Sequence, residues 1–162
     1  MLYKHSVGII LVLSCLLVTA EVRAGDHDEH HHGHGHNTIE MGLSNAVAFT
    51  LGEKEFAYGL HTHAIYTFGE TQFALGLGYE LIVGHHTHHT IGPMFCYRPT
   101  DPLNFCVSPG VLMDEHDVAF AAHIEATYEF NLHGVHVGPT VGFAYTPEEM
   151  HISVGVHTGV EF

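Results

Sequence analysis

Apolar and polar side chains alternate along most of the chain from Thr38 onward. Successive side chains of a β-strand point to opposite faces, so a period of two predicts strands. Runs with this period are separated by short turn or polar segments, among them Gly52-Glu53, Pro99 to Pro102 and Asn131-Leu132. The pattern predicts eight strands, at residues 38–51, 54–68, 72–84, 88–98, 103–114, 117–130, 133–146 and 149–162.

One face of the predicted strands is almost wholly apolar, as in the series Phe73, Leu75, Leu77, Tyr79 and Leu81. The opposite face holds Gly, Ala, Ser, Thr, His and Glu. A soluble sandwich would place its apolar face inside and cover its outer face with Lys and Glu. Small residues and histidine suit a crowded interior better, so we expect the apolar face to meet lipid and the polar face to fill a barrel.

Aromatic residues gather at one end of these strands, as expected at a membrane boundary. They are Tyr66, Phe68, Tyr97, Phe105, Tyr128, Phe130 and Phe162. An open sheet edge would leave unpaired backbone groups in hydrocarbon, so the sheet must close. The predicted fold is all-β: an eight-stranded antiparallel up-and-down transmembrane β-barrel with a disordered His-rich N-terminal tail.

The run from Val154 to Phe162 alternates apolar residues and ends on an aromatic one. Here the chain resembles the small eight-stranded outer-membrane proteins of Gram-negative bacteria, whose last strand typically ends in Phe. The resemblance implies a fold, a location in the outer membrane, contact with outer-membrane lipid, and reading of the Phe162 strand by the barrel-assembly machinery. It implies no activity. One departure is the brevity of the connections on the expected outer side.

The first residues predict export. Lys4 is a positive residue ahead of an apolar run, and Val22-Arg23-Ala24 ends in the small residue that a signal peptidase requires. We expect a signal peptide over residues 1–24, with cleavage after Ala20 as the alternative. Residues 25–37 contain no apolar side chain and should be a disordered tail. The barrel would then span residues 38–162.

Charge narrows the range of partners. The chain has 4 Lys and Arg residues against 18 Asp and Glu residues. After loss of the signal peptide only Lys54 and Arg98 remain as basic residues, so neither nucleic acid nor anionic lipid finds a basic patch. This balance favours cations.

The tail alternates histidine with acidic residues and glycine, and a flexible His tract binds Zn, Ni or Cu through interchangeable ligand sets. Its histidines are His27, His30, His31, His32, His34 and His36. A passive linker and an expression tag are the alternatives; glycines and acids interrupt this tract, unlike a tag.

With both termini in the periplasm, every other connection faces outside, and the local clusters of His and acids converge on one rim. This predicted rim comprises His85, His86, His88, His89, Asp114, Glu115, His116, Asp117, Glu148, Glu149 and His151. Imidazole with carboxylate suits Zn, Ni or Cu better than Ca or Mg. The alternative is that polar loops merely solvate the rim.

A further set of polar residues falls on the interior face of the strands: His61, His63, His123, Glu125, His136, His151 and His157, accompanied by Glu40, Glu80, Glu129 and Glu161. The packed interiors of such barrels favour a hydrogen-bond network over a buried metal site. Cys96 and Cys106 share this face on either side of Asp101, which favours a cross-strand disulfide over free thiols or a thiolate metal site.

Three function classes follow. The first is a metal-capture or transport-accessory protein that binds a divalent transition metal, Zn before Ni or Cu; the sequence identifies no transport partner. The second is a structural or adhesion-type barrel. The third, a hydrolase, is disfavoured because no Gly-x-Ser-x-Gly motif occurs and because Ser44, Ser108 and Ser153 are expected to reach a histidine only across the barrel. We therefore expect no enzyme.

Overall fold

The computed structural model describes residues 37–84, 87–114, 118–147 and 149–162. Its strands are β1 (Thr38–Thr50), β2 (Glu55–Thr67), β3 (Phe73–Val83), β4 (Thr87–Thr100), β5 (Leu103–Met113), β6 (Val118–Tyr128), β7 (Phe130–Leu132), β8 (Val135–Tyr145) and β9 (Met150–Glu161). Within these ranges no helix is long and apolar enough to cross a membrane. The predicted signal peptide and residues 25–36 of the predicted tail lie outside the described residues.

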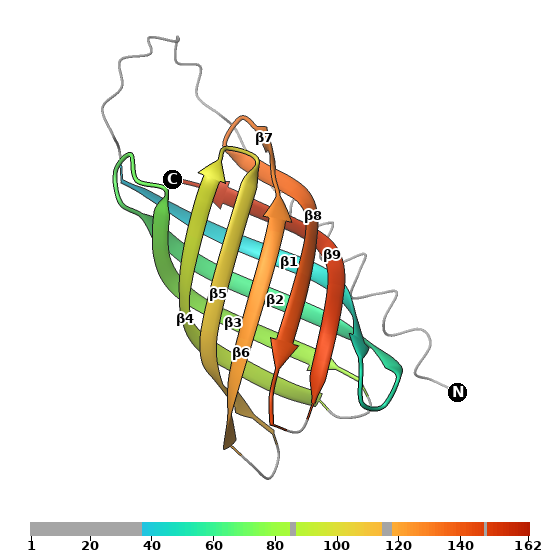
Figure 1. The fold of residues 1–162 in the computed structure, drawn as a ribbon. Helices are drawn as coiled ribbons and strands as arrows, with labels where there is room; N and C mark the ends of the chain where they lie inside the picture. Colours follow the sequence, from blue (N-terminus) through green and yellow to red (C-terminus); the bar gives the residue numbers. More distant parts are fainter. Residues whose placement is uncertain (1–36, 85–86, 115–117, 148) are drawn as a thin grey trace. The chain divides into compact units, whose positions relative to one another are not determined.

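The strands form one closed antiparallel barrel (Figure 1). From β1 to β6 each strand pairs with the next one in the sequence, β8 pairs with β9, and β1 also pairs with β9, which closes the sheet. β7 continues β6 beyond Glu129, and both pair with β8. The described residues therefore build eight strands in an up-and-down order, which confirms the predicted fold class.

One predicted turn was misplaced. Asn131 and Leu132 belong to β7, and the turn lies at His133 and Gly134, which the prediction assigned to the next strand. Both turn residues have positive φ, 57° and 85°. A two-residue hairpin turn needs this left-handed backbone at both positions, and glycine adopts it without strain. The amide of Gly134 donates to Oδ1 of Asn131 at 3.2 Å, which stabilises the turn.

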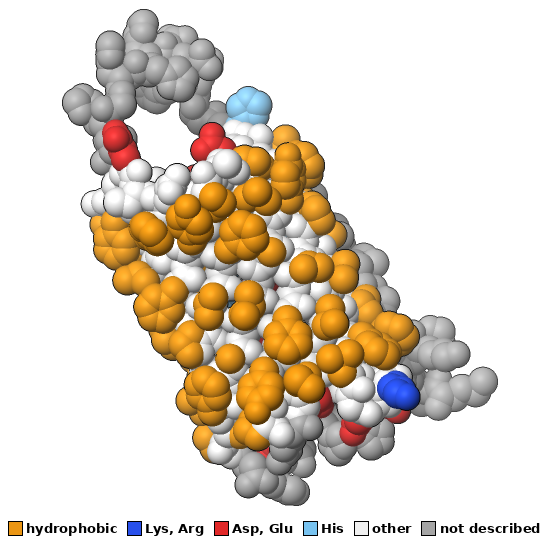
Figure 2. All heavy atoms as spheres, in the orientation of Figure 1, with side chains coloured by type: hydrophobic (Ala, Val, Ile, Leu, Met, Phe, Trp, Pro, Cys, Tyr) orange, Lys and Arg blue, Asp and Glu red, His pale blue; other side chains and the backbone are white. Residues whose placement is uncertain are grey.

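The outward face of the barrel is apolar, as predicted. Exposed large hydrophobic residues recur along every strand, and Figure 2 shows them as a belt over the visible wall. The predicted aromatic group lies at the end of the barrel that carries Phe162, with ring contacts between Tyr66 and Phe68 and between Tyr128 and Phe130. The strands β1 to β5, which carry part of this belt, are 11–14 residues long, and this length is enough to cross a bilayer. The exposed belt has the character of a lipid-facing surface.

The interior of the barrel has an apolar and a polar region. Ile65, Ala74, Met94, Cys96 and Cys106 form a buried apolar cluster between β2 and β5. A disulfide joins the two cysteines, which are direct partners in the β4–β5 ladder with their Cα atoms 4.1 Å apart. The sequence pattern gave the inner face only small and polar residues, and the structure adds Ile65, Ile82, Met94 and Leu112 to it.

Candidate metal centre inside the barrel

The strands bring all the predicted interior residues into the barrel. His61, His63, His123, Glu125, His136 and His157 are each buried, as are Glu40, Glu80 and Glu129. Their positions follow from strand parity, because every second side chain of β1, β2, β3, β6, β8 and β9 points inward. The polar groups therefore meet in a space that water enters little.

Glu40, His63 and His157 form the tightest group, here called the Glu40 centre. Each offers one ligand atom, and the three atoms lie within 4.8 Å of one another. Nε2 of His63 is 3.4 Å and Nε2 of His157 is 3.6 Å from Oε1 of Glu40. In tetrahedral Zn²⁺ sites with bonds of about 2.0–2.1 Å, neighbouring ligand atoms are roughly 3.3 Å apart. The spacing of the donor atoms therefore suits a metal ion between them.

Ser44 orients one of these ligands. Its Oγ lies 3.2 Å from Nδ1 of His157. When Nδ1 carries the proton and donates it to Ser44, Nε2 presents its lone pair toward Glu40, as metal-ligating histidines commonly do. Nε2 of His157 is buried and has no hydrogen-bond partner. A cation would supply the missing interaction.

Gly42 makes room for the two rings. It lies on β1, between β2 and β9, with His63 as its ladder partner on β2. A Cβ at this position would lie 2.5 Å from Cε1 of His63 and 2.6 Å from Cε1 of His157. The imidazoles therefore occupy the volume that a side chain would take.

Arg98 neutralises part of the charge. Its Nη2 donates to Oε2 of Glu40, on the carboxylate oxygen away from both histidines. The ion pair holds the carboxylate in place and leaves Oε1 toward His63 and His157. Sequence reasoning noted Arg98 only as a remaining basic residue; its parity with Cys96 was the signal that places it on the inner face.

Other pairs extend the polar network along the barrel. His61 Nδ1 is 3.2 Å from Glu125 Oε2, and its ring contacts the rings of His63 and His123 at centroid distances of 5.5 and 5.1 Å. Near the end of the barrel that carries Phe162, Nε2 of His136 is 3.2 Å from Oε2 of Glu161. These contacts support the predicted hydrogen-bond network, in which the Glu40 centre is embedded.

The predicted rim is partly wrong. His88 and His151 are buried inside the barrel, with exposed fractions of 7% and 2%, because their parity on β4 and β9 points them inward. His89 points to the outer face instead, where its Nδ1 lies 2.6 Å from the hydroxyl oxygen of Tyr79. The sequence pattern placed His88 and His89 by their distance from a turn and assigned His151 both to the rim and to the interior face. Strand parity decides where all three lie.

Two predicted rim residues do lie at a strand end. Glu149 accepts a hydrogen bond of 2.9 Å from Oγ1 of Thr50, and Asp114 follows β5 as an exposed residue. The others lie outside the described residues: His85, His86, Glu115, His116, Asp117 and Glu148. So do the tail histidines from His27 to His36.

The prediction that the strand serines reach a histidine only across the barrel was wrong for Ser44 and also for Ser108, which is the ladder partner of His123. Ser44 contacts His157 on the adjacent strand β9, and His157 lies beside Glu40. A serine, a histidine and an acid are therefore neighbours in space. Ser44, His157 and Glu40 are each no more than 2% exposed. A hydroxyl buried to this degree is closed to a substrate.

Two residues central to the geometry were predicted only as neighbours of the interior histidines and not as the residues around which these gather. Glu40 and Glu80 each lie near two histidines. Both share the inward parity with the histidines, which was the available signal. Their contacts depend on how far the strands are staggered when the sheet closes, which a strand pattern does not state.

Neither any protein-family model nor any curated protein sequence matches the chain. Solved structures do resemble it. Neisserial surface protein A matches with a TM-score of 0.59 at 11% identity, over 78% of this chain and 97% of that one. The attachment invasion locus protein Ail of Yersinia pestis, in complex with the heparin analogue sucrose octasulfate, matches with a TM-score of 0.54 at 11% identity, over 79% and 99%.

The N-terminal β-barrel domain of Pseudomonas aeruginosa OprF matches with a TM-score of 0.52 at 17% identity, over 80% of this chain and 100% of that one. At these identities the likeness concerns the fold. It agrees with the closed eight-stranded sheet, the apolar outer belt and the aromatic end described above. The chain therefore has the fold of the small eight-stranded outer-membrane β-barrels.

Proposed function

We propose that this protein is an exported outer-membrane barrel that binds a divalent transition metal, Zn²⁺ before Ni²⁺ or Cu²⁺, for metal capture or as an accessory to transport. The observation that carries the proposal is the Glu40 centre. Two imidazoles and a carboxylate converge there with donor atoms 3.4 and 3.6 Å apart.

The chemistry of the ligands supports this class of ion. Two histidines and one carboxylate are a frequent Zn²⁺ set that leaves a fourth position for water or another ligand. The formal net charge of −14 also favours cations over anions. In the proposal, the tail histidines and the remaining rim residues collect the ion, and the Glu40 centre holds it.

The same charge argues against a sulfated ligand. Ail is solved with a heparin analogue. Here the described residues at the β1–β2 hairpin include Glu53 and Glu55, with Lys54 between them, and Glu149 lies beside the hairpin. These three carboxylates at one end of the barrel would repel a polyanion.

Calorimetry with Zn²⁺ on the full chain, purified from outer membranes in detergent, tests the proposal. A full-length variant in which serine replaces every tail histidine separates the barrel from the tail. We expect a barrel site tighter than about 100 μM in both. His63→Gln and His157→Gln in the tail variant should each weaken that site by at least about tenfold.

His136→Gln is the matched control, because His136 is also buried and paired with a carboxylate but lies outside the Glu40 centre. It should leave Zn²⁺ affinity within about twofold. Far-ultraviolet circular dichroism of each variant checks that the barrel still forms. Unchanged affinity in folded His63→Gln and His157→Gln proteins would reject the Glu40 centre, and absence of any Zn²⁺ site tighter than about 100 μM in the full chain would leave a structural barrel as the function.

A further inference from the structure

A second group of histidines surrounds a carboxylate nearer the end of the barrel that carries the β1–β2 hairpin. Oε1 of Glu80 is 3.5 Å from Nε2 of His151 and 4.0 Å from Nε2 of His123. The ring of His88 lies 6.2 Å from the ring of His151. These four residues, here called the second cluster, come from β3, β4, β6 and β9.

Each of the three histidines of the second cluster has a ring nitrogen without a hydrogen-bond partner. Nε2 of His88, His123 and His151 is buried in each case and has no hydrogen-bond partner. All three residues are more than nine-tenths buried. A buried polar atom without a partner is unfavourable by roughly 1–3 kcal/mol. A cation beside Glu80 would satisfy the nitrogens of His123 and His151, with His88 next to His151. The donor atoms of this group are spread more widely than those of the Glu40 centre, so the rings would turn toward Glu80 to bind the ion together.

Glycine again provides the space. A Cβ at Gly142 on β8 would lie 2.8 Å from Nε2 of His123 and 2.5 Å from Oγ of Ser153. The backbone of β8 therefore approaches the ring of His123 more closely than any side chain would allow. His123 is held on the interior side of the wall, facing Glu80.

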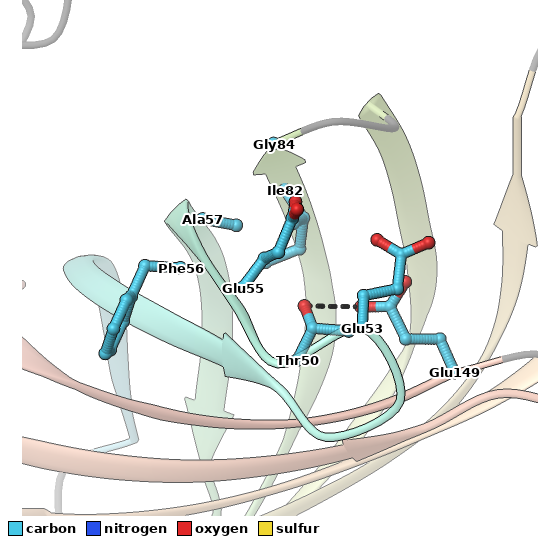
Figure 3. A pocket seen from close by; sticks show the side chains of 8 residues that line it. All are labelled: Thr50, Glu53, Glu55, Phe56, Ala57, Ile82, Gly84 and Glu149. Carbon is cyan, nitrogen blue, oxygen red and sulfur yellow. Dashed lines mark hydrogen bonds between the residues drawn. The ribbon is translucent and has the colours of Figure 1, made fainter.

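An acidic pocket adjoins the second cluster at the hairpin end. Glu53, Glu55 and Glu149 line it together with Thr50 and Ile82, and Figure 3 shows these residues with the hydrogen bond from Thr50 to Glu149. Register ties this pocket to the cluster below. Thr50 is the ladder partner of His151, and Ile82 is the ladder partner of His88.

Carboxylates around a concave surface raise the local concentration of cations. The ladder pairs place the histidine side chains one strand away from the pocket lining. An ion held by Glu53, Glu55 and Glu149 is therefore separated from the second cluster by no more than the residues that pair with Thr50 and Ile82 in the ladder.

We propose that the second cluster is a second site for a divalent transition metal, loaded from the acidic pocket. Glu80, His123 and His151 would be its main ligands, with His88 on the side of the pocket. The site is separate from the Glu40 centre, and His61 lies between them, with ring contacts to both His123 and His63. The proposal shares with the proposed function only the class of ion.

Co²⁺ titration followed by visible absorption tests the second site, because Co²⁺ reports the number and type of its ligands. The protein is the full chain in detergent with serine in place of the tail histidines. We expect two Co²⁺ ions per chain. His151→Gln and His123→Gln should each remove one ion from the tight range, weakening it at least about tenfold, and retain the other.

This experiment distinguishes loss of the Glu40 centre from loss of the second cluster. His63→Gln should remove the ion of the Glu40 centre and retain the ion of the second cluster, and His136→Gln should retain both. Folded His151→Gln and His123→Gln proteins that keep full stoichiometry and affinity would overturn the second site. A change in these two variants alone, with His63→Gln unaffected, would support the second site and reject the Glu40 centre.

The role of the pocket has its own measurement. Replacing Glu53, Glu55 and Glu149 together by glutamine should slow Co²⁺ binding in stopped-flow experiments by roughly tenfold at low ionic strength, without changing stoichiometry. The difference should shrink as salt is added. An unchanged rate at low salt would overturn loading from the acidic pocket.

Discussion

The imidazole rings of His63 and His157 stack almost in parallel, at an interplanar angle of 4° and a centroid distance of 5.2 Å. The two residues belong to β2 and β9, which are separated by β1. Their rings meet because Gly42 on the strand between them has no side chain. The geometry of the Glu40 centre therefore depends on a residue that cannot bind a metal.

Gly42→Ala should disturb the centre without removing a ligand. The added methyl group would overlap both rings, so they must turn away and the three donor atoms separate. We expect Zn²⁺ affinity to fall at least about tenfold, measured by calorimetry. Gly52→Ala is the control, because a Cβ there meets nothing within 4 Å. Equal Zn²⁺ affinity in both variants and the parent protein would contradict this account.

Metal affinity should depend on pH. An imidazole binds a metal only in its neutral form, so protonation competes with the ion. Lowering the pH therefore weakens binding, and we expect Zn²⁺ affinity to fall steeply below about pH 6. Calorimetry at pH 7.5 and 5.5 measures the change. Constant affinity over this interval would exclude histidine as the main ligand type.

If the outer belt faces lipid, a charged side chain placed on it should lower the free energy of unfolding, and the loss should be larger near the middle of the membrane than near its surface. Leu77 is 63% exposed and lies in the middle of β3, opposite Ala64 and Pro93 of the neighbouring strands. Leu77→Arg should lower the free energy of unfolding by about 2–4 kcal/mol in lipid vesicles. Val118→Arg, at the first residue of β6, should cost about 0–1 kcal/mol. Urea unfolding followed by circular dichroism compares them.

A soluble protein would respond differently to the same substitutions. If the belt faced water, both arginines would be tolerated within about 0.5 kcal/mol. Equal small effects at Leu77 and Val118 would therefore contradict a lipid-facing belt.

The disulfide should contribute to stability. Cys96 and Cys106 close a loop with a sequence separation of 10. Replacing both by serine should lower the free energy of unfolding by about 2–3 kcal/mol under oxidising conditions. The chain has no Trp, so tyrosine fluorescence or circular dichroism follows the unfolding. In the presence of a reductant the parent protein should approach the variant; a parent that stays equally stable in both conditions would refute the contribution.

The sequence predicted which side chains point outward from most of the barrel, but it did not predict most of the contacts between side chains in the interior. Parity alone placed Leu77 outside and His61 inside, because a strand exposes alternate residues to opposite faces. Distance from a turn misled the prediction at His88, where parity holds up to the strand end, whereas parity also placed His151 on the interior face, where it lies. The turn at His133 and Gly134 was missed because Asn131 is itself a common turn residue; in the structure it precedes the turn and accepts a hydrogen bond from the amide of Gly134.

Contacts across the barrel required the three-dimensional structure. His151 on β9 meets Glu80 on β3, and His61 on β2 meets Glu125 on β6. Neither pair consists of ladder partners, so these contacts depend on the stagger of the closed sheet and on which interior positions hold glycine. The sequence names the chemical groups and their face but leaves open which of them meet.

The ion pair of Arg98 with Glu40 bears on selectivity. Because one carboxylate oxygen is engaged by the guanidinium, Glu40 can offer a metal the other oxygen alone. Calcium requires about six to eight oxygen donors and often takes both oxygens of a carboxylate. Calcium would therefore compete poorly for this position, and an ion that prefers nitrogen ligands could occupy it.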